Sequence, residues 1–316
     1  MTPDERRRLL AALARPGGGF AMVANDGRES FRGMLKRAGK ATDDASLAHF
    51  KELIARHLGD ACSAMLVDLD YGLPALAELS DRAPGTGRIV AVDVFHGPRF
   101  GPPTGTSLDV EAFRPGALPP DLHALKFFMF WHPDQPMSRR RDQASEFVER
   151  CATLGLLSLL EGVVQLPGTD ERFDESLLRA AEEFGQARPD LYKTQVPTLG
   201  RAALDEVQRL STSLTRAVGV PWVALSNGVE ADRFADVVGA VCRGGASGFL
   251  AGRASWSAAV DADDPAAELA SAGRSRLAAF ADRVDAEGVP WWVAAGLSVP
   301  EPHHPTSGPA TVDPAR

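Results

Sequence analysis

The chain has 316 residues, 44% of them hydrophobic, and a formal net charge of −8 at pH 7. This length and apolar content can bury one large core, and an acidic chain is a poor partner for nucleic acid or an anionic membrane. No run approaches the roughly 18 apolar residues of a membrane span, and the arginine-containing first segment lacks a small-residue cleavage site, so neither a span nor a signal peptide is expected. Three widely spaced cysteines in apolar contexts are expected to be reduced core residues of a cytoplasmic protein.

Eight short aliphatic or β-branched runs are predicted strands, at 20–25, 63–68, 88–93, 124–131, 156–164, 190–196, 222–226 and 247–252. Most precede a segment of helical periodicity, at 47–57, 72–81, 139–154, 176–186, 202–217 and 231–242. This alternation predicts an α/β protein with a parallel sheet, and the count of eight predicts a closed (β/α)8 TIM barrel in a single domain. A Rossmann sheet is the competing architecture, but no GxGxxG motif follows a strand.

Two segments do not fit the alternation. Residues 95–120 are rich in Gly and Pro and are too long for an ordinary connection, which is typical of a functional or mobile loop. From residue 298 onward no periodic apolar face is left, so we expect a barrel at 1–297 and a disordered tail at 298–316. His303 and His304 lie in this tail and are assigned no metal role.

Lysine is scarce in this chain. Five of the 34 basic residues are lysines, namely Lys36, Lys40, Lys51, Lys126 and Lys193. Arginine cannot serve as a neutral amine nucleophile, so a lysine inside an apolar strand calls for a chemical explanation. Lys193, in PDLYKTQVP, is a candidate nucleophile toward a carbonyl, because desolvation and a second cation disfavour an ammonium ion; Lys126, in ALKFFMFWHPD, is the candidate second cation. Two alternatives stay open: an ion-paired Lys193 and a Lys126 that extends to solvent.

Carboxylates also stand near the ends of predicted strands, which face one common mouth in this fold. Glu161 interrupts the apolar run GLLSLLEGVV and must be paired or protonated, so it is a candidate proton carrier or the partner of a lysine. Asp26 and Asp68 are candidates for proton transfer or for fixing the lysines, and Asp93 and Arg28 also lie at strand ends.

The last two predicted strands end in small residues, Ser226-Asn227-Gly228 and Ala251-Gly252-Arg253. Loops after strands 7 and 8 form the recurrent phosphate site of this fold, where glycine lets an anion approach the backbone. Arg253 would add a charged fork for the anion's oxygens. The alternative is a pair of tight turns that use glycine for geometry alone.

At these residues the chain resembles the class I, lysine Schiff-base tagatose 1,6-bisphosphate aldolase family, and most of all its sulfofructose-phosphate aldolase branch. The similarity runs from about residue 18 to residue 284, through GGFAMVANDGRESFR, AMLVDLDYGLPAL, LKFFMFWHPD, LLSLLEGVV, DLYKTQVP, PWVALSNGV and GASGFLAGRASW. The resemblance implies that Lys193 is the Schiff-base lysine, Glu161 the acid/base glutamate and Lys126 the second active-site lysine.

The resemblance also implies which residues bind the substrate. Ser226, Gly228, Gly252 and Arg253 match the pocket for an anionic end of the sugar, and Asp26 and Arg28 match an Asp-Gln-Arg motif after the first strand. The chain departs from that motif, because Gly27 stands where relatives have Gln and Asn25 replaces an apolar residue. A substrate contact is therefore expected to be lost at Gly27.

The predicted reaction is cleavage of a ketohexose phosphate to dihydroxyacetone phosphate and a three-carbon aldehyde. The candidate substrates are tagatose 1,6-bisphosphate and 6-deoxy-6-sulfofructose 1-phosphate; a keto-deoxy-gluconate phosphate and a catalytically silent sugar-phosphate-binding regulator are the alternatives. No cofactor or metal is expected, since His96, His123 and His132 lack ligand spacing. Trp291 and Trp292 fit either a subunit contact or the core, so a homodimer and a homotetramer both stay open.

Overall fold

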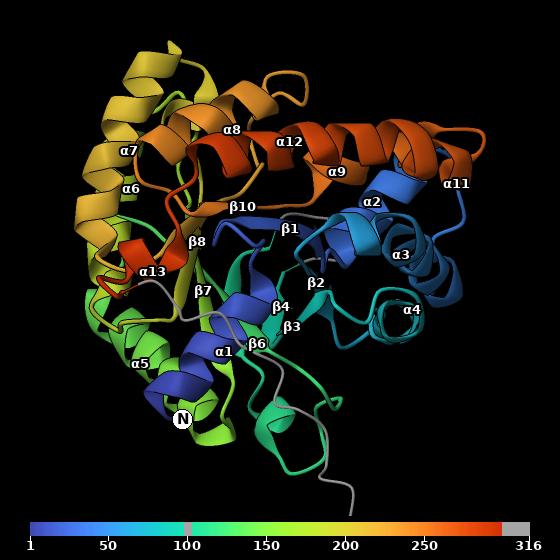
Figure 1. Cartoon of the computed structure of the whole chain (residues 1–316), viewed down its shortest axis with the longest axis horizontal. Helices are drawn as coiled ribbons and strands as arrows, with labels where there is room; N and C mark the ends of the chain where they lie inside the picture. The colour runs from blue at the N-terminus through green and yellow to red at the C-terminus, as the bar shows by residue number, and fades with distance from the viewer. Residues whose placement is uncertain (98–102, 299–316) are drawn as a thin grey trace, which may run out of the picture.

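The structure, a computed structural model, describes residues 1–97 and 103–298. Eight parallel strands close into a barrel in the order β1-β10-β9-β8-β7-β6-β3-β2, with helices between them, which confirms the predicted (β/α)8 fold (Figure 1). Each barrel strand overlaps one predicted run. Their bounds are β1 Phe20–Asn25, β2 Ala64–Asp68, β3 Gly87–Ala91, β6 Ala124–Trp131, β7 Leu157–Val164, β8 Leu191–Thr194, β9 Trp222–Ala224 and β10 Gly248–Ala251.

Helices surround the barrel and cover the outer face of its strands (Figure 1). In α3, for example, Leu47, Ile54 and Leu58 recur at helical spacing and are completely buried, so one stripe of the helix packs on the sheet. The longer helices are α1 Pro3–Leu13, α2 Glu29–Arg37, α3 Asp44–Leu58, α4 Leu73–Arg82, α5 Met137–Leu154, α6 Phe173–Gly185, α7 Leu204–Val218, α8 Phe234–Arg243 and α12 Arg274–Glu287; short turns form α9 Arg253–Trp256, α10 Ala258–Asp261, α11 Pro265–Glu268 and α13 Trp291–Ala294.

Two apolar cores follow from the alternation of side chains along each strand. The larger core lies between strands and helices, and the smaller one fills the barrel interior. Leu10 and Leu13 of α1 and Trp291 of α13 belong to the interior core, together with the first residues of several strands. These helices therefore close the amino end of the barrel, as Figure 1 shows for α1 and α13, and Trp291 is a core residue with 1% of its surface exposed. The opposite end carries the polar side chains.

The long segment after β3, predicted as a loop, contains regular structure. Asp93–His96 (β4) and Gly105–Leu108 (β5) pair as an antiparallel hairpin, and Val110–Phe113 form a 3-10 turn. The predicted strand at 88–93 thus ends early, and Asp93 starts the hairpin. The predicted tail at 298–316 lies, apart from residue 298, outside the described residues, so its boundary stays a prediction.

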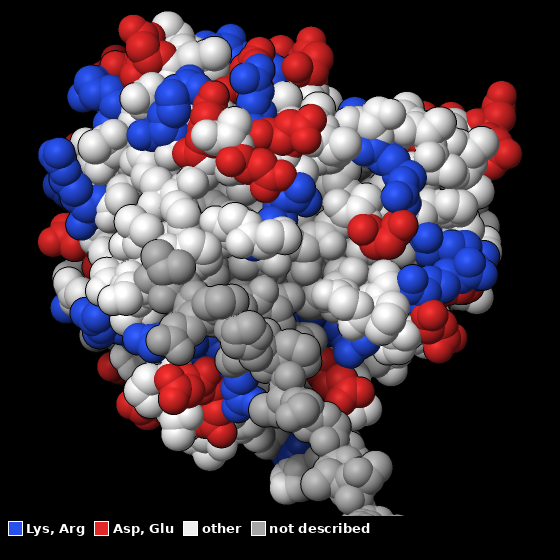
Figure 2. All heavy atoms as spheres, viewed as in Figure 1, with Lys and Arg blue, Asp and Glu red and all other residues white. Residues whose placement is uncertain are grey.

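The surface carries charges of both signs. Figure 2 shows blue and red side chains interspersed over the face drawn there. No helix in the described part of the chain is long and apolar enough to cross a membrane. The three cysteines, Cys62, Cys151 and Cys242, are free and buried, as predicted.

Candidate active site

Charged side chains at the carboxyl end of the barrel continue the inward-facing alternation of the strands. Each follows an interior apolar residue by two positions and therefore points to the same side of its strand. The pairs are Ala24 and Asp26, Ala91 and Asp93, Ala124 and Lys126, Leu159 and Glu161, and Leu191 and Lys193. The apolar plug of the barrel thus ends in a layer of charged groups drawn from neighbouring strands.

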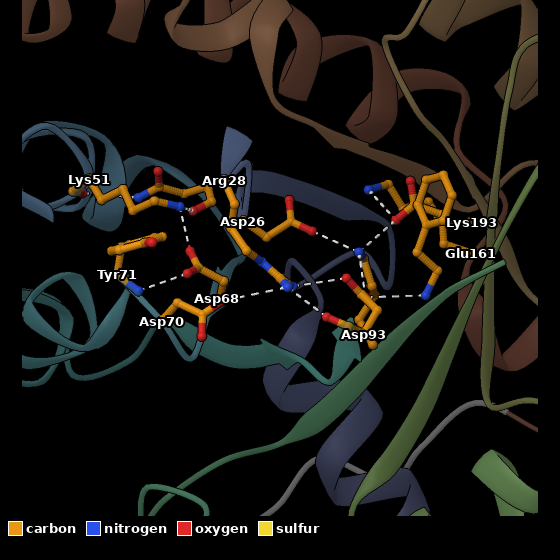
Figure 3. Close-up of polar contacts among 12 residues, drawn as sticks. Asp26, Arg28, Lys51, Asp68, Asp70, Tyr71, Asp93, Glu161 and Lys193 are labelled. Carbon is orange, nitrogen blue, oxygen red and sulfur yellow. Dashed lines mark hydrogen bonds and ion pairs between the residues drawn. The ribbon is translucent and has the colours of Figure 1, made fainter. Parts of the chain in front are cut away.

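Two lysines of this layer bond to one carboxylate oxygen. Lys193 Nζ lies 3.0 Å and Lys126 Nζ lies 3.2 Å from Glu161 Oε2. The register places Glu161 beside Lys193 on adjacent strands, and the close-up in Figure 3 shows the two side chains meeting. Only 4% of Lys193, 5% of Glu161 and 1% of Lys126 is exposed. Lys193 is thus ion-paired, and the alternative in which Lys126 extends to solvent is wrong.

Lys126 is held as a cation by two further carboxylates, Asp26 at 2.8 Å and Asp93 at 3.0 Å. Burial alone would lower the pKa of Lys126, but its three carboxylate neighbours raise it above the ordinary value. Burial would likewise raise the pKa of Asp26, but Lys126 and Lys193 lower it below its usual range. For Asp93, burial dominates and raises the pKa.

Arg28 binds Asp93, one of the charged residues of this layer. Its guanidinium donates to the Asp93 carbonyl at 2.6 Å and to Asp93 Oδ2 at 2.9 Å, and it lies 3.6 Å from Asp70 Oδ2. It also stacks over the Phe95 ring, 5.3 Å from the centroid. Arg28 therefore links the segment after β1 to the β4 strand of the hairpin (Figure 3).

Residues 20–258 match a protein family described as DeoC/LacD family aldolase. The chain belongs to this family. Among curated relatives, tagatose 1,6-diphosphate aldolase of Listeria monocytogenes serotype 4a (strain HCC23) is 26% identical over 91% of this chain and 94% of its own length. Tagatose 1,6-diphosphate aldolase 1 of Enterococcus faecalis (strain ATCC 700802 / V583) is 25% identical over 80% of this chain and 85% of its own. The protein is a class I aldolase, a carbon–carbon lyase.

Solved structures of other aldolases share the fold. Fructose-bisphosphate aldolase from Plasmodium falciparum aligns with a TM-score of 0.68 at 15% identity, covering 94% of this chain and 96% of that one. An archaeal fructose-1,6-bisphosphate aldolase, whose catalytic lysine is covalently bound to the carbinolamine intermediate, aligns with a TM-score of 0.57 at 13% identity, covering 89% and 99%. These likenesses support the barrel assignment.

Asp68 of the aldolase lies apart from the lysines that the sequence analysis considered for it. It is completely buried and forms an ion pair with Lys51 of α3, and its Oδ1 accepts the Tyr71 N–H at 2.8 Å. Lys51 was not among the predicted site residues. Its signal was its position in α3, four residues after Leu47 and three before Ile54, on the apolar stripe where a lysine is out of place.

The predicted anion-binding residues lie at the ends of β9, which neighbours the strand of Lys193, and of β10, the next strand in the barrel. Ser226 is buried, whereas Arg253 is exposed and donates to the Asn227 side chain. Among the described residues Arg253 forms no ion pair with a carboxylate. Desolvation, and to a smaller extent the charge of Arg37, lower the pKa of Arg253. Its guanidinium charge is not neutralised by a carboxylate in the part of the chain that the structure describes.

Steric limits by themselves account for glycine at positions 228 and 252. Gly228 has φ +85°, and a Cβ on it would lie 2.9 Å from the Leu199 side chain. A Cβ on Gly252 would lie 2.9 Å from the Ala24 carbonyl oxygen. Both turns therefore need glycine for packing, whether or not they also bind an anion.

The layer combines an amine, a carboxylate bonded to it and a fixed cation in a site nearly closed to water. Such a set can form a covalent bond to a carbonyl and transfer protons around it. No group of three or more His, Cys, Asp or Glu side chains in residues 1–97 and 103–298 is placed to hold a metal ion.

Proposed function

We propose that this aldolase cleaves a ketohexose phosphate through a Schiff base on Lys193, releasing dihydroxyacetone phosphate and a three-carbon aldehyde. The observation that carries the proposal is the single Glu161 oxygen bonded by both Lys193 and Lys126 inside the barrel mouth. Tagatose 1,6-bisphosphate is the first candidate substrate, because the curated relatives are named for it. The second is 6-deoxy-6-sulfofructose 1-phosphate, on the resemblance of the sequence motifs.

In the proposed mechanism Lys193 passes a proton to Glu161, which lies 3.0 Å away, and its neutral amine attacks the ketone carbon. The resulting carbinolamine loses water to give an iminium ion. Glu161 donates the proton that leaves with the water and then removes the proton of the C4 hydroxyl. The C3–C4 bond breaks, and its electron pair moves into the iminium as the aldehyde leaves. Glu161 returns this proton to C3 of the enamine, and water hydrolyses the product iminium to free Lys193.

The charged neighbours have supporting parts in this proposal. Lys126 stays positive and holds the Glu161 carboxylate oxygen that Lys193 also contacts. Asp26 and Asp93 hold Lys126 in place from the other side. Near Lys126 the Asp26 side chain is the most accessible carboxylate, at 16% exposed, and it can contact substrate.

The strand order supports a direction for the bound sugar. Ser226 and Arg253 follow β9 and β10 on one side of the Lys193 strand, and Glu161 and Lys126 lie on β7 and β6 on the other. A phosphate near Arg253 would meet the unpaired positive charge there. The carbon chain beyond C2 would then extend past Glu161 toward Lys126, where bond cleavage requires the proton carrier.

Borohydride trapping tests the proposed nucleophile. The enzyme is incubated with dihydroxyacetone phosphate, reduced, digested and analysed by mass spectrometry, and the adduct is expected on Lys193. Lys193→Ala should give no adduct, while Lys40→Ala, whose amine bonds the Ala262 carbonyl at 2.8 Å, should label like the wild type. An adduct that persists in Lys193→Ala defeats the assignment.

Comparing substrates tests the finer proposal. Turnover is measured as dihydroxyacetone phosphate release from tagatose 1,6-bisphosphate and 6-deoxy-6-sulfofructose 1-phosphate, and as pyruvate release from a keto-deoxy-gluconate phosphate, at equal concentration. One of the first two is expected to give the highest kcat/KM. Preference for the third, whose C1–C3 fragment leaves as pyruvate rather than dihydroxyacetone phosphate in the analogous cleavage, would replace the proposed substrate class.

A further inference from the structure

A second buried ion pair, between Lys51 and Asp68, lies next to the proposed catalytic layer but takes no part in it. Both side chains are completely buried. Lys51 Nζ also donates to the Asn25 carbonyl at 2.8 Å, and Asn25 Nδ2 donates back to the Lys51 carbonyl at 2.9 Å. Figure 3 shows Lys51, Asp68 and Tyr71 grouped at a distance from Lys193 and Glu161. Three elements, β1, β2 and α3, are joined by these contacts.

Stability alone is a weak reason for this pair. Removing two charges from water carries a large penalty, and well-packed apolar side chains of similar volume often stabilise a protein equally well. Burial lowers the pKa of Lys51 even though Asp68 opposes the shift, so the desolvation penalty is felt here. Lys51 also sits on the apolar stripe of α3, between Leu47 and Ile54, where a methionine would be an ordinary core residue.

These contacts lie where the β-sheet pairing of β1 ends. On one side, β1 pairs with β10 only as far as Val23, and on the other it pairs with β2 as far as Asn25. The next residue, Asp26, is therefore beyond the ladder on both sides. The Lys51 ammonium, bonded to the Asn25 carbonyl, is the contact immediately before the segment that carries Asp26 and Arg28.

Asp68 performs a similar task at the end of β2. Its second oxygen accepts the Tyr71 N–H at 2.8 Å and so shapes the turn that carries Asp70. Asp70 in turn faces Arg28 at 3.6 Å. The pair thus sets two adjacent strand ends whose side chains meet Lys126 and Arg28.

Building on the proposed Schiff-base function, we propose that Lys51 and Asp68 are positioning residues of the cleavage reaction. They fix the backbone at Asn25 so that the Asp26 carboxylate meets Lys126, and Lys126 in turn stays beside Glu161. Neither residue is exposed, so neither contacts the substrate. A displacement of about 1 Å in a catalytic constellation can reduce the rate roughly 100-fold, so a remote anchor has a measurable effect on turnover.

The test removes both charges together, in Lys51→Met/Asp68→Asn. The Asn can still accept the Tyr71 N–H, so the β2 turn is kept. The expected result is a kcat about 10- to 100-fold lower on the best ketose phosphate, with KM within about threefold of wild type. The single variant Asp68→Asn is measured beside it and should also lower kcat. This second variant keeps the proposal testable if the double variant folds poorly.

A matched buried ion pair elsewhere provides the control. Arg140 of α5 and Glu183 of α6 are 6% and 4% exposed. Arg140 donates from Nε to Glu183 Oε1 and from Nη2 to Glu183 Oε2, each at 3.0 Å. They lie outside the barrel interior. Arg140→Met/Glu183→Gln should lower the melting temperature but leave kcat within about twofold of wild type, which separates a positioning effect from general destabilisation.

The outcomes distinguish the two claims. If folded Lys51→Met/Asp68→Asn and Asp68→Asn both retain wild-type kcat, or if the Arg140/Glu183 control loses turnover equally, the positioning role is overturned. If the wild type traps dihydroxyacetone phosphate on a residue other than Lys193, the proposed function is overturned, while the kcat comparison still judges the positioning role. Trapping on Lys193 in the double variant is expected to reach the wild-type extent, because the anchor does not touch that lysine.

Discussion

Replacing Glu161 by Gln perturbs the centre of the proposed mechanism with almost no change of volume. In the structure Glu161 Oε2 accepts from two ammonium groups, at 3.0 Å and 3.2 Å. The amide has no charge to attract them and cannot act as a general acid or base near neutral pH. General acid–base catalysis contributes about 100- to 10,000-fold, so kcat should fall by that factor, equivalent to about 2.7–5.5 kcal/mol in the activation barrier.

The stability cost of this substitution should be smaller than its catalytic cost. Breaking a buried ion pair can cost about 3–5 kcal/mol when a charge is left alone. Here Lys126 keeps its ion pairs with Asp26 and Asp93. We therefore expect a loss of about 1–3 kcal/mol in the free energy of unfolding, the range for a charged hydrogen bond left unmade.

The assay couples steady-state release of dihydroxyacetone phosphate to urea unfolding of the same preparations. Glu183→Gln is the matched control, because Glu183 is also buried and accepts from Arg140 at 3.0 Å and from Trp131 at 2.7 Å, away from the barrel interior. It should lose stability and keep kcat. A Glu161→Gln enzyme with kcat within about threefold of wild type would refute the reasoning, as would an equal loss in the control.

Three further predictions follow from the site. Replacing Arg253 by Ala removes a charge-assisted contact of about 1.5–3 kcal/mol, so KM for a ketose phosphate should rise about 10- to 150-fold with kcat less affected; an unchanged KM would place the anion elsewhere. Because the pKa of Asp26 is lowered in the folded state, its stabilisation is present above the unfolded pKa of about 3.9 and is lost as pH falls below it. The free energy of unfolding of Asp26→Asn, measured with urea, should therefore fall less steeply with decreasing pH than that of the wild type. The difference in slope is at most about 1.4 kcal/mol per pH unit, and parallel curves would contradict this. Dialysis against EDTA should leave turnover unchanged, and a loss restored by added zinc would favour metal-dependent cleavage.

Much of the barrel could be predicted because its signals are local. The runs Phe20–Asn25 and Ala124–Trp131 are strands with the bounds that were predicted, since strands buried on both faces are continuous apolar runs. The β4–β5 hairpin was not predicted, because its pairing joins residues on either side of a Gly- and Pro-rich stretch that by itself indicates only a long connection. Asp93 was therefore predicted in a barrel strand, whereas in the structure it pairs with Leu108 in the hairpin.

The candidate site shows the same division. Lys193 and Glu161 were identifiable because each breaks an apolar strand, and a charge in such a run needs either a partner or a chemical role. The contact between them could not be predicted from either run, because it depends on the register of β7 against β8. Asp68 was a candidate for proton transfer or for fixing the lysines of the strands, yet it pairs with Lys51 of α3.

By itself the sequence determined the number and order of the barrel elements, the family and the residue types that supply the chemistry. These are properties of short runs and their spacing, and they are read one segment at a time. Only the tertiary structure decided which charges meet: Lys126 with three carboxylates, Arg28 with Asp93, and Lys51 with the end of β1. Partners of buried charges are chosen by distances between strands and helices remote in the chain, and these distances exist only once the barrel has closed.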